Sequence, residues 1–542
     1  MFVRRDQLFQ RIQSERLGYH FDEILSYSIF NSKNLRLVHS NDPCICSQLL
    51  IDCLIRTPAF PNEKIDLLTL CKEHYANNPH QLSVIEEFQR DYSSDRSVWW
   101  LTRYAFFSRL FYKAMKMENI HLLLHYRFFI EDLKQQLEKT RMSSSVRVYR
   151  AQLLSKEEFH FWTISIGDFI SIHSFLITSS HREQTRSILT SSLLTDDMEK
   201  VFFEINANHR TDKTNVFSQV NSLSSVPERD DVVFMMGSIF RLIHIDRDID
   251  GIWNIQLILC ASKDHQLQTV LEEKKSQLDI VDGDRLSFGF LLDDMKKFDQ
   301  AEKYYRYVLK RIPKDHEDVT RCYHALGEIM QKKGDYQASI KWYQLSLAID
   351  RQMSKEDDPN MAIGYNSLAA VYTRQGDYTL ALESYEKALK ILKNTFGDDH
   401  PDLAMCYNNM GIIYEEQRNY SDALDYCQRA WNIRQKYLPV EHPTIAQSHA
   451  CIGNVHYHLG HYDLALEHYH LALVIFKKVF VGYDQNIAMI LRNIGLVYQK
   501  KEDWGQALSY LEKALLIYRQ LFPVTYTEIV QIEQLLQRLS SK

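Results

Sequence analysis

The second half of the chain carries an apolar pattern that repeats. An aromatic residue recurs every 42 residues, at Tyr336, Tyr378, Tyr420, Tyr462 and Trp504. Each of these residues opens a segment such as "YTLALESYEKALKI", in which apolar side chains recur at the three- and four-residue spacing of a helix. An earlier copy begins at Phe298, 38 residues before Tyr336. The pattern predicts six helical repeats over residues 285–520.

Small residues keep one place in every copy, which predicts closely packed helix pairs. The first helix of the pairs carries, in register, Gly327, Ala369, Gly411, Gly453 and Gly495. The second helix carries Ser339, Ala381, Ala423, Ala465 and Ala507. Antiparallel helices approach closely only where side chains are short. Prolines such as Pro401 begin first helices, and Gly376 ends one. We therefore expect an all-α solenoid, closed by a capping helix within 521–542.

The first half changes from a helical to a strand-like pattern. From Leu67 to about Lys139, segments such as "SVWWLTRYAFFSRLFYKAM" have helical spacing, so we expect their aromatic side chains to lie in a core. Short β-branched and aromatic runs follow at 146–151, 168–180, 200–208, 231–246 and 252–260. Helices followed by strands indicate an α+β domain with a mostly antiparallel sheet. We expect this domain at 61–265, a helical linker at 266–284 and an unassigned extension at 1–60.

Composition and charge narrow the class of protein. The chain has 542 residues, 45% of them hydrophobic and 25% charged, with a formal net charge of −6. This charge gives no reason to expect nucleic acid or an anionic membrane as partner. The first residues lack the apolar segment of a signal peptide, and no apolar stretch is long enough to span a membrane.

Cysteine usage indicates a reduced, cytoplasmic protein. Five of the nine cysteines lie in apolar patterns, where a thiol usually acts as a small core residue. Cys44, Cys46 and Cys53 are close in sequence but lack a fourth ligand at zinc spacing. We therefore predict no metal site.

The repeats resemble a known family. Their 42-residue period and the linkers "DDHPDLA" and "VEHPTIA" are similar to tetratricopeptide repeats of the kinesin-light-chain type. The resemblance implies a concave groove, lined by first helices, that holds an extended peptide or a partner helix. A kinesin-associated adaptor would also need a long heptad coil, and residues 264–282 are too short for one.

Equivalent positions of the first helices carry candidate peptide-binding residues. Asn366, Asn408 and Arg492 recur at the repeat spacing, and an amide there could bond a peptide backbone. The alternative is a solvated polar face. The histidines of "NVHYHLGHYDLALEHYH" lie on two helices, so we expect them to be scattered and not to form a metal site.

Three short motifs follow one another in the strand-rich part. They are "VYRA" at 148–151, "SFLITS" at 174–179 and "ERDDVVFMMGSIFRL" at 228–242. Their order resembles the mono-ADP-ribosyltransferases of the Arg-Ser-Glu class, over about residues 61–265. The resemblance implies transfer of ADP-ribose from NAD(P) to a protein, with arginine as the family's acceptor. It also implies that a strand arginine holds a phosphate, a Ser-Thr-Ser strand end orients an acid, and a Glu stabilises the developing cation.

The resemblance assigns cofactor-binding residues in the first two motifs. Arg150 takes the position of the phosphate-binding arginine, and Ala151 stands where the family usually has Gly. The backbone donor and acceptor after the arginine are kept. Ser174, Thr178 and Ser179 are the hydroxyls expected on the NAD side of the second motif.

The acid motif departs from the family pattern. Asp231 stands at the catalytic Glu, Arg229 replaces the acid that selects an arginine acceptor, and Ile177 replaces the first serine of Ser-Thr-Ser. Asp is shorter than Glu, and misplacement by about 1 Å can cost about a hundredfold in rate. A one-residue shift offers Glu228 and Asp230 as another acid pair, but it turns both to the opposite strand face unless a bulge intervenes.

Two functional hypotheses follow. In the first, an NAD-dependent protein mono-ADP-ribosyltransferase is fused to a repeat array that recruits its target and raises the target's local concentration. In the second, a catalytically degenerate transferase domain is carried on a scaffold that acts only in protein binding.

Overall fold

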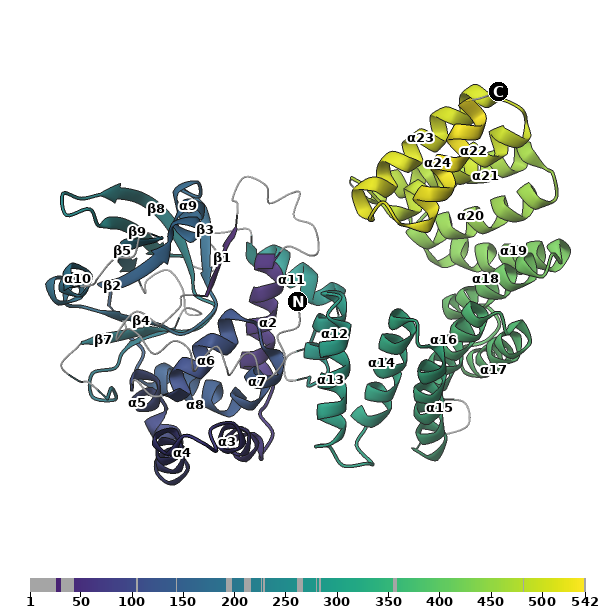
Figure 1. The fold of residues 1–542 in the computed structure, drawn as a ribbon. Coiled ribbons are helices and arrows are strands. Elements are labelled where there is room, and N and C mark those ends of the chain that lie inside the picture. Colours follow the sequence, from purple (N-terminus) through teal and green to yellow (C-terminus); the bar gives the residue numbers. More distant parts are fainter. Residues whose placement is uncertain are drawn as a thin grey trace. The chain divides into compact units, whose positions relative to one another are not determined.

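The chain divides into two compact units, Met1–Pro313 and Lys314–Lys542. The structure is a computed structural model that describes residues 26–30, 43–103, 106–142, 144–191, 197–208, 216–225, 227, 230–260, 267–278, 280–281, 284–353, 358–480 and 482–540. In Figure 1 the first unit combines a sheet with helices, and the second consists of paired helices. Both classes of structure agree with the sequence patterns.

The first unit contains the helices expected between Leu67 and Lys139. They are α3 (Glu63–His74), α4 (Pro79–Asp91), α5 (Ser97–Thr102), α6 (Phe106–Lys116), α7 (Ile120–His125) and α8 (Arg127–Lys139). One more helix, α2 (Pro43–Arg56), lies in the extension that the sequence left unassigned. The Asn78 side chain accepts a hydrogen bond from a first-turn N–H and thereby caps α4. Phe88, Trp100 and Phe107 are fully buried, so the prediction of an aromatic core is confirmed.

Nine described strands form the sheet. They are β1 (Tyr27–Phe30), β2 (Val146–Ser155), β3 (Phe169–Ile172), β4 (Leu176–Ser179), β5 (Met198–Ala207), β6 (Phe217–Gln219), β7 (Asp231–Phe234), β8 (Ile239–Arg247) and β9 (Trp253–Leu259). Their order is β1-β3-β8-β9-β5-β2-β4-β7-β6. Among these strands β5 and β9 pair in parallel and the other pairs are antiparallel, as expected for a mostly antiparallel sheet.

Two of the expected strand runs are each divided into two strands. The run 168–180 becomes β3, which pairs with β1 and β8, and β4, which pairs with β2 and β7. The run 231–246 becomes β7 and β8, separated by a turn in which Gly237 has a φ of 82°. Each break moves the chain to a different neighbour in the sheet. A continuous apolar run cannot reveal such a change, because both halves are buried.

The two faces of β2 pack against different partners. Val148 and Leu154 lie in the main core with Trp162 of α9 (Lys156–Thr163). Tyr149 and Leu153 instead pack with residues of α10 (Arg182–Ser191) and β5. Successive residues of a strand point to opposite faces. Every second residue of β2, including the candidate Arg150, therefore belongs to the face of the main core.

The first unit also includes the first helical repeat. After α11 (Leu267–Gln277) come α12 (Ser287–Asp294) and α13 (Phe298–Leu309). The hydroxyl of Tyr307 donates a hydrogen bond of 3.0 Å to Glu63, and Glu63 is paired with Arg127. The Arg127 and Glu63 side chains are 1% and 0% exposed. This buried network ties α13 to the helices of the expected α+β domain, so the compact unit ends at Pro313.

The second unit consists of helix pairs and a last single helix. The pairs are α14 (Asp318–Lys333) with α15 (Tyr336–Met353), α16 (Pro359–Gln375) with α17 (Tyr378–Phe396), α18 (Pro401–Glu416) with α19 (Tyr420–Tyr437), α20 (Pro443–His458) with α21 (Tyr462–Val479), and α22 (Gln485–Lys500) with α23 (Trp504–Leu521). Helix α24 (Thr527–Ser540) follows them. The side chains of Asp358, His400 and His442 cap the first helices that begin with proline.

Glycine permits the close approach of the paired helices. A methyl group added at Gly453 would lie 2.8 Å from the ring of Tyr469, and one at Gly495 would lie 2.8 Å from Leu511. These distances are shorter than normal carbon contacts, which are about 3.5–4.0 Å. The prediction that the small residues lie between paired helices is confirmed.

The cysteines and the helices bear on two further sequence predictions. All nine cysteines are buried thiols, including Cys44, Cys46 and Cys53 near the start of the first unit. In the described part of the chain, no group of three or more His, Cys, Asp or Glu residues is arranged to hold a metal ion. None of the described helices combines the length and the hydropathy needed to cross a membrane.

The buried pair of Arg127 and Glu63 generates a stability prediction. We expect Arg127→Met to lower the free energy of unfolding of the first unit by about 3–5 kcal/mol, because it leaves the Glu63 carboxylate buried without its cation. Urea unfolding measures the change. The double variant Glu63→Gln, Arg127→Met should recover most of the loss.

A matched control is Lys116→Met. Lys116 pairs with Glu158 at 3.4 Å, and both side chains are more than a third exposed. This variant should cost at most about 1 kcal/mol. Equal losses from Arg127→Met and Lys116→Met would contradict the importance given to the buried pair.

Candidate functional site

Three sequence motifs of the first unit meet on adjacent strands. Tyr149 of β2 is opposite Ser179 of β4, and Ser179 is opposite Asp231 of β7. Residues that are far apart in the sequence thus form one row across three strands. The motifs "VYRA", "SFLITS" and the acidic "DD" are brought together along this row.

Arg150 holds β4 against β2. Its Nη1 donates a hydrogen bond of 2.8 Å to the backbone carbonyl of Ile177. Its Nε and Nη2 donate to the Gln152 side chain at 3.2 and 3.0 Å. Among the described residues, β2 pairs with β4 only at Tyr149 and Ser179. The guanidinium of Arg150 therefore adds a second link between the two strands. Ala151 follows it and pairs with Phe202 of β5.

Asp231, the predicted catalytic acid, is the first residue of β7 and is buried. Asp231 is 2% exposed, and the Ser224 hydroxyl donates a hydrogen bond of 3.4 Å to its Oδ2. Ile177 lies opposite Val233, two rows from Asp231. The hydroxyl beside Asp231 comes from Ser224. Sequence reasoning missed Ser224, which lies seven residues before the acid in an irregular segment.

The segment that carries Ser224 is fixed to the helical part of the unit. The backbone N–H of Ser225 donates to the Thr102 hydroxyl at 2.9 Å. Thr102 is the last residue of α5, and it lies within the tryptophan-rich sequence expected to be core. The segment whose Ser224 bonds Asp231 is thus positioned by Thr102, which lies more than a hundred residues earlier in the chain.

Asp230 points away from Asp231. Its φ of 52° is in the left-handed region, so it does not continue the strand. Its carboxylate accepts hydrogen bonds from Asn221 and, at 3.2 Å, from Gln219, and lies 3.4 Å from His181 Nε2. Its side chain is 31% exposed, which makes it the more accessible of the two acids.

The three candidate hydroxyls occupy different environments. Glu228 and Arg229 lie outside the described residues. Thr178 is 3% exposed and donates to the Val232 carbonyl at 2.8 Å, so its hydroxyl serves the sheet. Ser174 is 2% exposed. Ser179 is half-buried at the strand end and accepts a hydrogen bond from the backbone N–H of His181.

Asn366 and Asn408, two of the predicted peptide-binding residues, are buried. They are 7% and 8% exposed. The Oδ1 of Asn366 lies 3.1 Å from the Cys406 thiol, and the Oδ1 of Asn408 accepts a hydrogen bond of 3.2 Å from Arg434. The alternative expectation of a solvated polar face is wrong for both residues. The Asn366 oxygen links α16 to α18 of the next pair, whereas the Asn408 oxygen links the two helices of one pair, α18 and α19. The repeat spacing alone cannot distinguish these roles from an exposed one.

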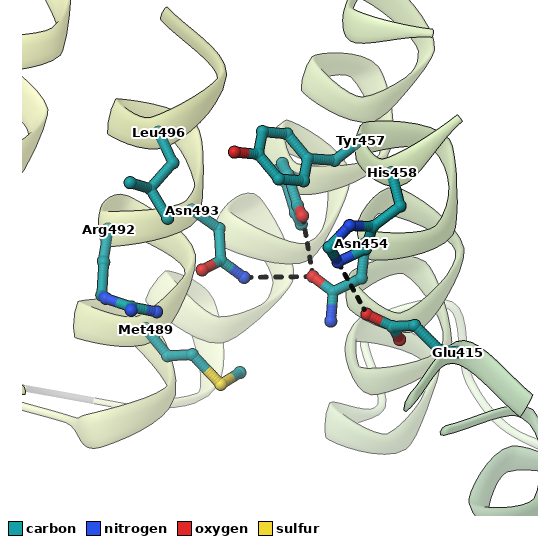
Figure 2. Close-up of a pocket in the computed structure, with 9 residues that line it drawn as sticks. Glu415, Asn454, Tyr457, His458, Met489, Arg492, Asn493 and Leu496 are labelled. Carbon is teal, nitrogen blue, oxygen red and sulfur yellow. Dashed lines mark hydrogen bonds and ion pairs between the residues drawn. The ribbon is translucent and has the colours of Figure 1, made fainter. Parts of the chain in front are cut away.

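Arg492, the third predicted peptide-binding residue, lines a pocket in the second unit. The pocket has a volume of about 370 Å³ and is lined by Glu415, Asn454, Tyr457, His458, Tyr469, Met489, Arg492, Asn493 and Leu496. These residues come from α18, α20, α21 and α22. Figure 2 shows Glu415 and His458 on one side, Arg492 on the other, and the amides of Asn454 and Asn493 between them.

The polar groups between the two charges are held in place by hydrogen bonds. Asn454 Oδ1 accepts from the Tyr469 hydroxyl at 2.7 Å and from Asn493 Nδ2 at 3.1 Å (Figure 2). His458 Nε2 lies 3.4 Å from Glu415 Oε1. Burial, together with the charge of the neighbouring Glu416, raises the pKa of Glu415 to about 7. Burial lowers the pKa of His458, which favours its neutral form at neutral pH.

Histidines of α20 and α21 lie close together, contrary to the expectation that they are scattered. His449 Nδ1 and His468 Nδ1 are 3.0 Å apart, and the rings of His456 and His468 stack with centroids 5.7 Å apart. The two antiparallel helices of one pair bring His456 and His468 onto a shared contact, whereas His458 faces Glu415 of α18.

Comparison with known families identifies the helical repeats. The tetratricopeptide repeat family model matches residues 286–352, 360–436 and 444–520. The carboxy-terminal region is an array of tetratricopeptide repeats. Such arrays present extended concave surfaces and generally bind other proteins. Among curated proteins, none shows a significant match to the chain.

Parts of the chain also resemble solved structures. BtubC (BKLC) from P. vanneervenii is 23% identical over 42% of this chain and 90% of its own, with a TM-score of 0.36. A putative kinesin light chain with tetratricopeptide-like repeats from Podosopora anserina is 20% identical over 38% of this chain and 98% of its own, with a TM-score of 0.33.

The histidine contacts of the tetratricopeptide array generate a pH prediction. Burial and the neighbouring His468 lower the pKa of His449 from 6.5 to about 4. The unfolded chain therefore takes up a proton first, so the stabilisation is present above pH 6.5 and is lost as the pH falls towards 4. We expect this loss to be about 1–2 kcal/mol, because solvent partly screens the imidazoles.

Thermal unfolding between pH 4 and 7.5 measures the effect. The double variant His449→Asn, His468→Asn should depend less on pH than the wild type. His400→Asn is the control, because asparagine can keep the helix cap that His400 provides. Identical pH profiles for the wild type and the double variant would contradict the prediction.

Proposed function

We propose that the first unit contains an NAD(P)-dependent protein mono-ADP-ribosyltransferase domain and that the tetratricopeptide repeats recruit its protein acceptor. The observation that carries this proposal is the meeting of "VYRA", "SFLITS" and the acidic motif on β2, β4 and β7. The resemblance rests on the order of the motifs along the sequence. That the motifs lie on adjacent strands does not follow from this order, so it supports the proposal independently. The repeat array supplies the protein-binding part.

The side chains around this row fit an anionic dinucleotide substrate. Arg150 carries a fixed positive charge next to the Tyr149–Ser179–Asp231 row, with its side chain on the face of β2 opposite Tyr149. On the other face of β2, Tyr149 stacks on Phe202 with ring centroids 5.7 Å apart, and the Arg182 guanidinium lies 5.6 Å from the Phe202 ring. Guanidinium groups and a serine hydroxyl suit phosphate and ribose oxygens.

In the proposed reaction, the bond between ribose and nicotinamide breaks and a nucleophile of the acceptor protein takes its place. Nicotinamide leaves with the bonding electrons, and the acceptor's proton passes to water. Arg150 would hold substrate charge and keep β4 in position, with Ala151 and Ser179 beside it. The Asp231 carboxylate would stabilise the positive charge that develops on the ribose.

The burial of Asp231 sets a condition on this chemistry. Because Asp231 is 2% exposed, contact with a ribose requires the residues that bury it, Ser224 among them, to move. Asp230 is accessible without such a movement and has His181 beside it. In the proposal, Asp231 is the acid of the reaction and Asp230 is a second, solvent-facing acid.

A second candidate is a degenerate transferase domain on a protein-binding scaffold. The observation that favours it is the combination of a covered Asp231 with isoleucine, 7% exposed, at the first hydroxyl position. The tetratricopeptide array has the same role in both candidates. They differ in whether the first unit breaks the bond between ribose and nicotinamide.

Transfer of label from NAD distinguishes the candidates. Purified full chain is incubated with labelled NAD and a mixture of protein acceptors, and the label on protein is measured. We expect transfer by the wild type and a loss of about a hundredfold in Asp231→Asn, because the side chain keeps its size but loses its charge. Arg150→Ala should lose transfer as well. Asp246→Asn, on exposed β8 surface, is the matched control and should keep the wild-type rate.

The opposite result identifies the second candidate. Wild-type protein would give neither transfer nor NAD hydrolysis, whereas the double variant Ile177→Ser, Asp231→Glu would gain activity. Equal rates for the wild type and Asp231→Asn would instead remove Asp231 from the reaction.

A further inference from the structure

The pocket of the tetratricopeptide array contains a carboxyl group, that of Glu415, which no lysine or arginine of the described residues neutralises. The Glu415 side chain is 14% exposed. The titratable groups that face it are Glu416 on its own helix, Cys451 and His458 on α20, and Tyr469 on α21. None of these four is a lysine or an arginine, and the lowered pKa of His458 favours a neutral imidazole.

The other side of the pocket contains a guanidinium with unused hydrogen-bonding capacity. Arg492 Nη2 donates to the neutral side chain of Gln531 at 3.3 Å. Arg492 Nε is buried and has no hydrogen-bond partner among the described residues. A buried N–H donor without an acceptor costs about 1–3 kcal/mol. An anionic ligand group would supply that acceptor.

The two charged groups are separated by a fixed polar bridge. The side chains of Asn454 and Asn493 are hydrogen-bonded to each other between Glu415 and Arg492 (Figure 2). Met489 and Leu496 add apolar surface on the Arg492 side. A ligand with only one charge would satisfy one end of the pocket and leave the other end uncompensated.

We propose that this pocket binds two side chains of one extended peptide, a basic side chain at Glu415 and an acidic side chain at Arg492. In an extended chain, residues i and i+2 point to the same side, so one peptide can present both charges. Charge-assisted hydrogen bonds of this kind are stronger than neutral ones, and charge complementarity gives selectivity among peptides. The inference rests on the protein-binding role given to the repeats, and it names the chemistry of the partner.

Peptide binding to the full chain tests the assignment. The probes are dye-labelled nonapeptides of Gly, Ser and Ala that carry Lys-x-Glu or Glu-x-Lys at the centre. Matched peptides have Ala in place of Lys, of Glu, or of both. Fluorescence anisotropy should show that one mixed-charge peptide binds about tenfold more tightly than either singly charged form.

Variants of the protein assign each charge to its partner. Glu415→Gln should abolish the preference for Lys and leave the preference for Glu, and Arg492→Gln should do the reverse. Arg429→Gln and Glu467→Gln change exposed charges on the second helices and should leave all affinities unchanged. Thermal unfolding of every variant checks that the array is folded.

The pH dependence of binding provides a second readout. A basic side chain favours ionised Glu415, whose pKa is about 7 in the free protein. Affinity for the mixed-charge peptide should therefore rise between pH 6 and pH 8. In Glu415→Gln this rise should be absent.

Three results would overturn the inference. They are equal binding of the mixed-charge and uncharged peptides, no binding of any peptide, and a charge preference that survives both Glu415→Gln and Arg492→Gln. These results are distinct from failure of the proposed enzyme, which is measured as label transferred from NAD. Charge-selective peptide binding without transfer would sustain the pocket assignment and overturn the transferase.

Discussion

The join between β2 and β4 is the constraint on which the proposed transferase site depends. It consists of the Tyr149–Ser179 row and the guanidinium of Arg150, which reaches the Ile177 carbonyl. This narrow join positions β4, and β4 in turn carries β7 with Asp231. Arg150 therefore combines a structural role with its proposed contact to substrate, so loss of its side chain affects strand geometry and charge together. The position of the acid depends on a residue of another strand.

Burial of a carboxyl group is a feature that both candidate sites share. Asp231 is buried and accepts a hydrogen bond from Ser224, and the next residue, Ser225, is bonded to Thr102 of α5. Glu415 is covered by the helices around its pocket and has its pKa raised towards neutrality. In both places a carboxyl group is buried. Burial makes the charged form of a carboxyl group less stable, and it strengthens the attraction between that charge and a cation. Such groups respond strongly to whatever ligand charge approaches them.

Much of the fold was predictable because its determinants are local or periodic. The helices of the first unit follow from apolar spacing, and the repeats follow from small residues that recur every 42 positions. The candidate site was predictable only as a set of motifs. Ser224, His181 and Thr102 could not be found, because they reach the acids through an irregular segment and a distant helix. Asn366 and Asn408 show the same limit, since equal spacing does not reveal which face is buried.

The sequence by itself determined the periods, the helix starts and the places where helices must approach closely. It also determined which residue types the three motifs carry, including the shorter acid at Asp231 and the isoleucine at 177. Tertiary structure decided that Asp230 and Asp231 point apart, that Asp231 is covered, and that Glu415 and Arg492 share one pocket. The physical reason is the separation along the chain of the residues that each property depends on. Spacing along a chain fixes local conformation, whereas burial and charge pairing depend on groups that only folding brings together.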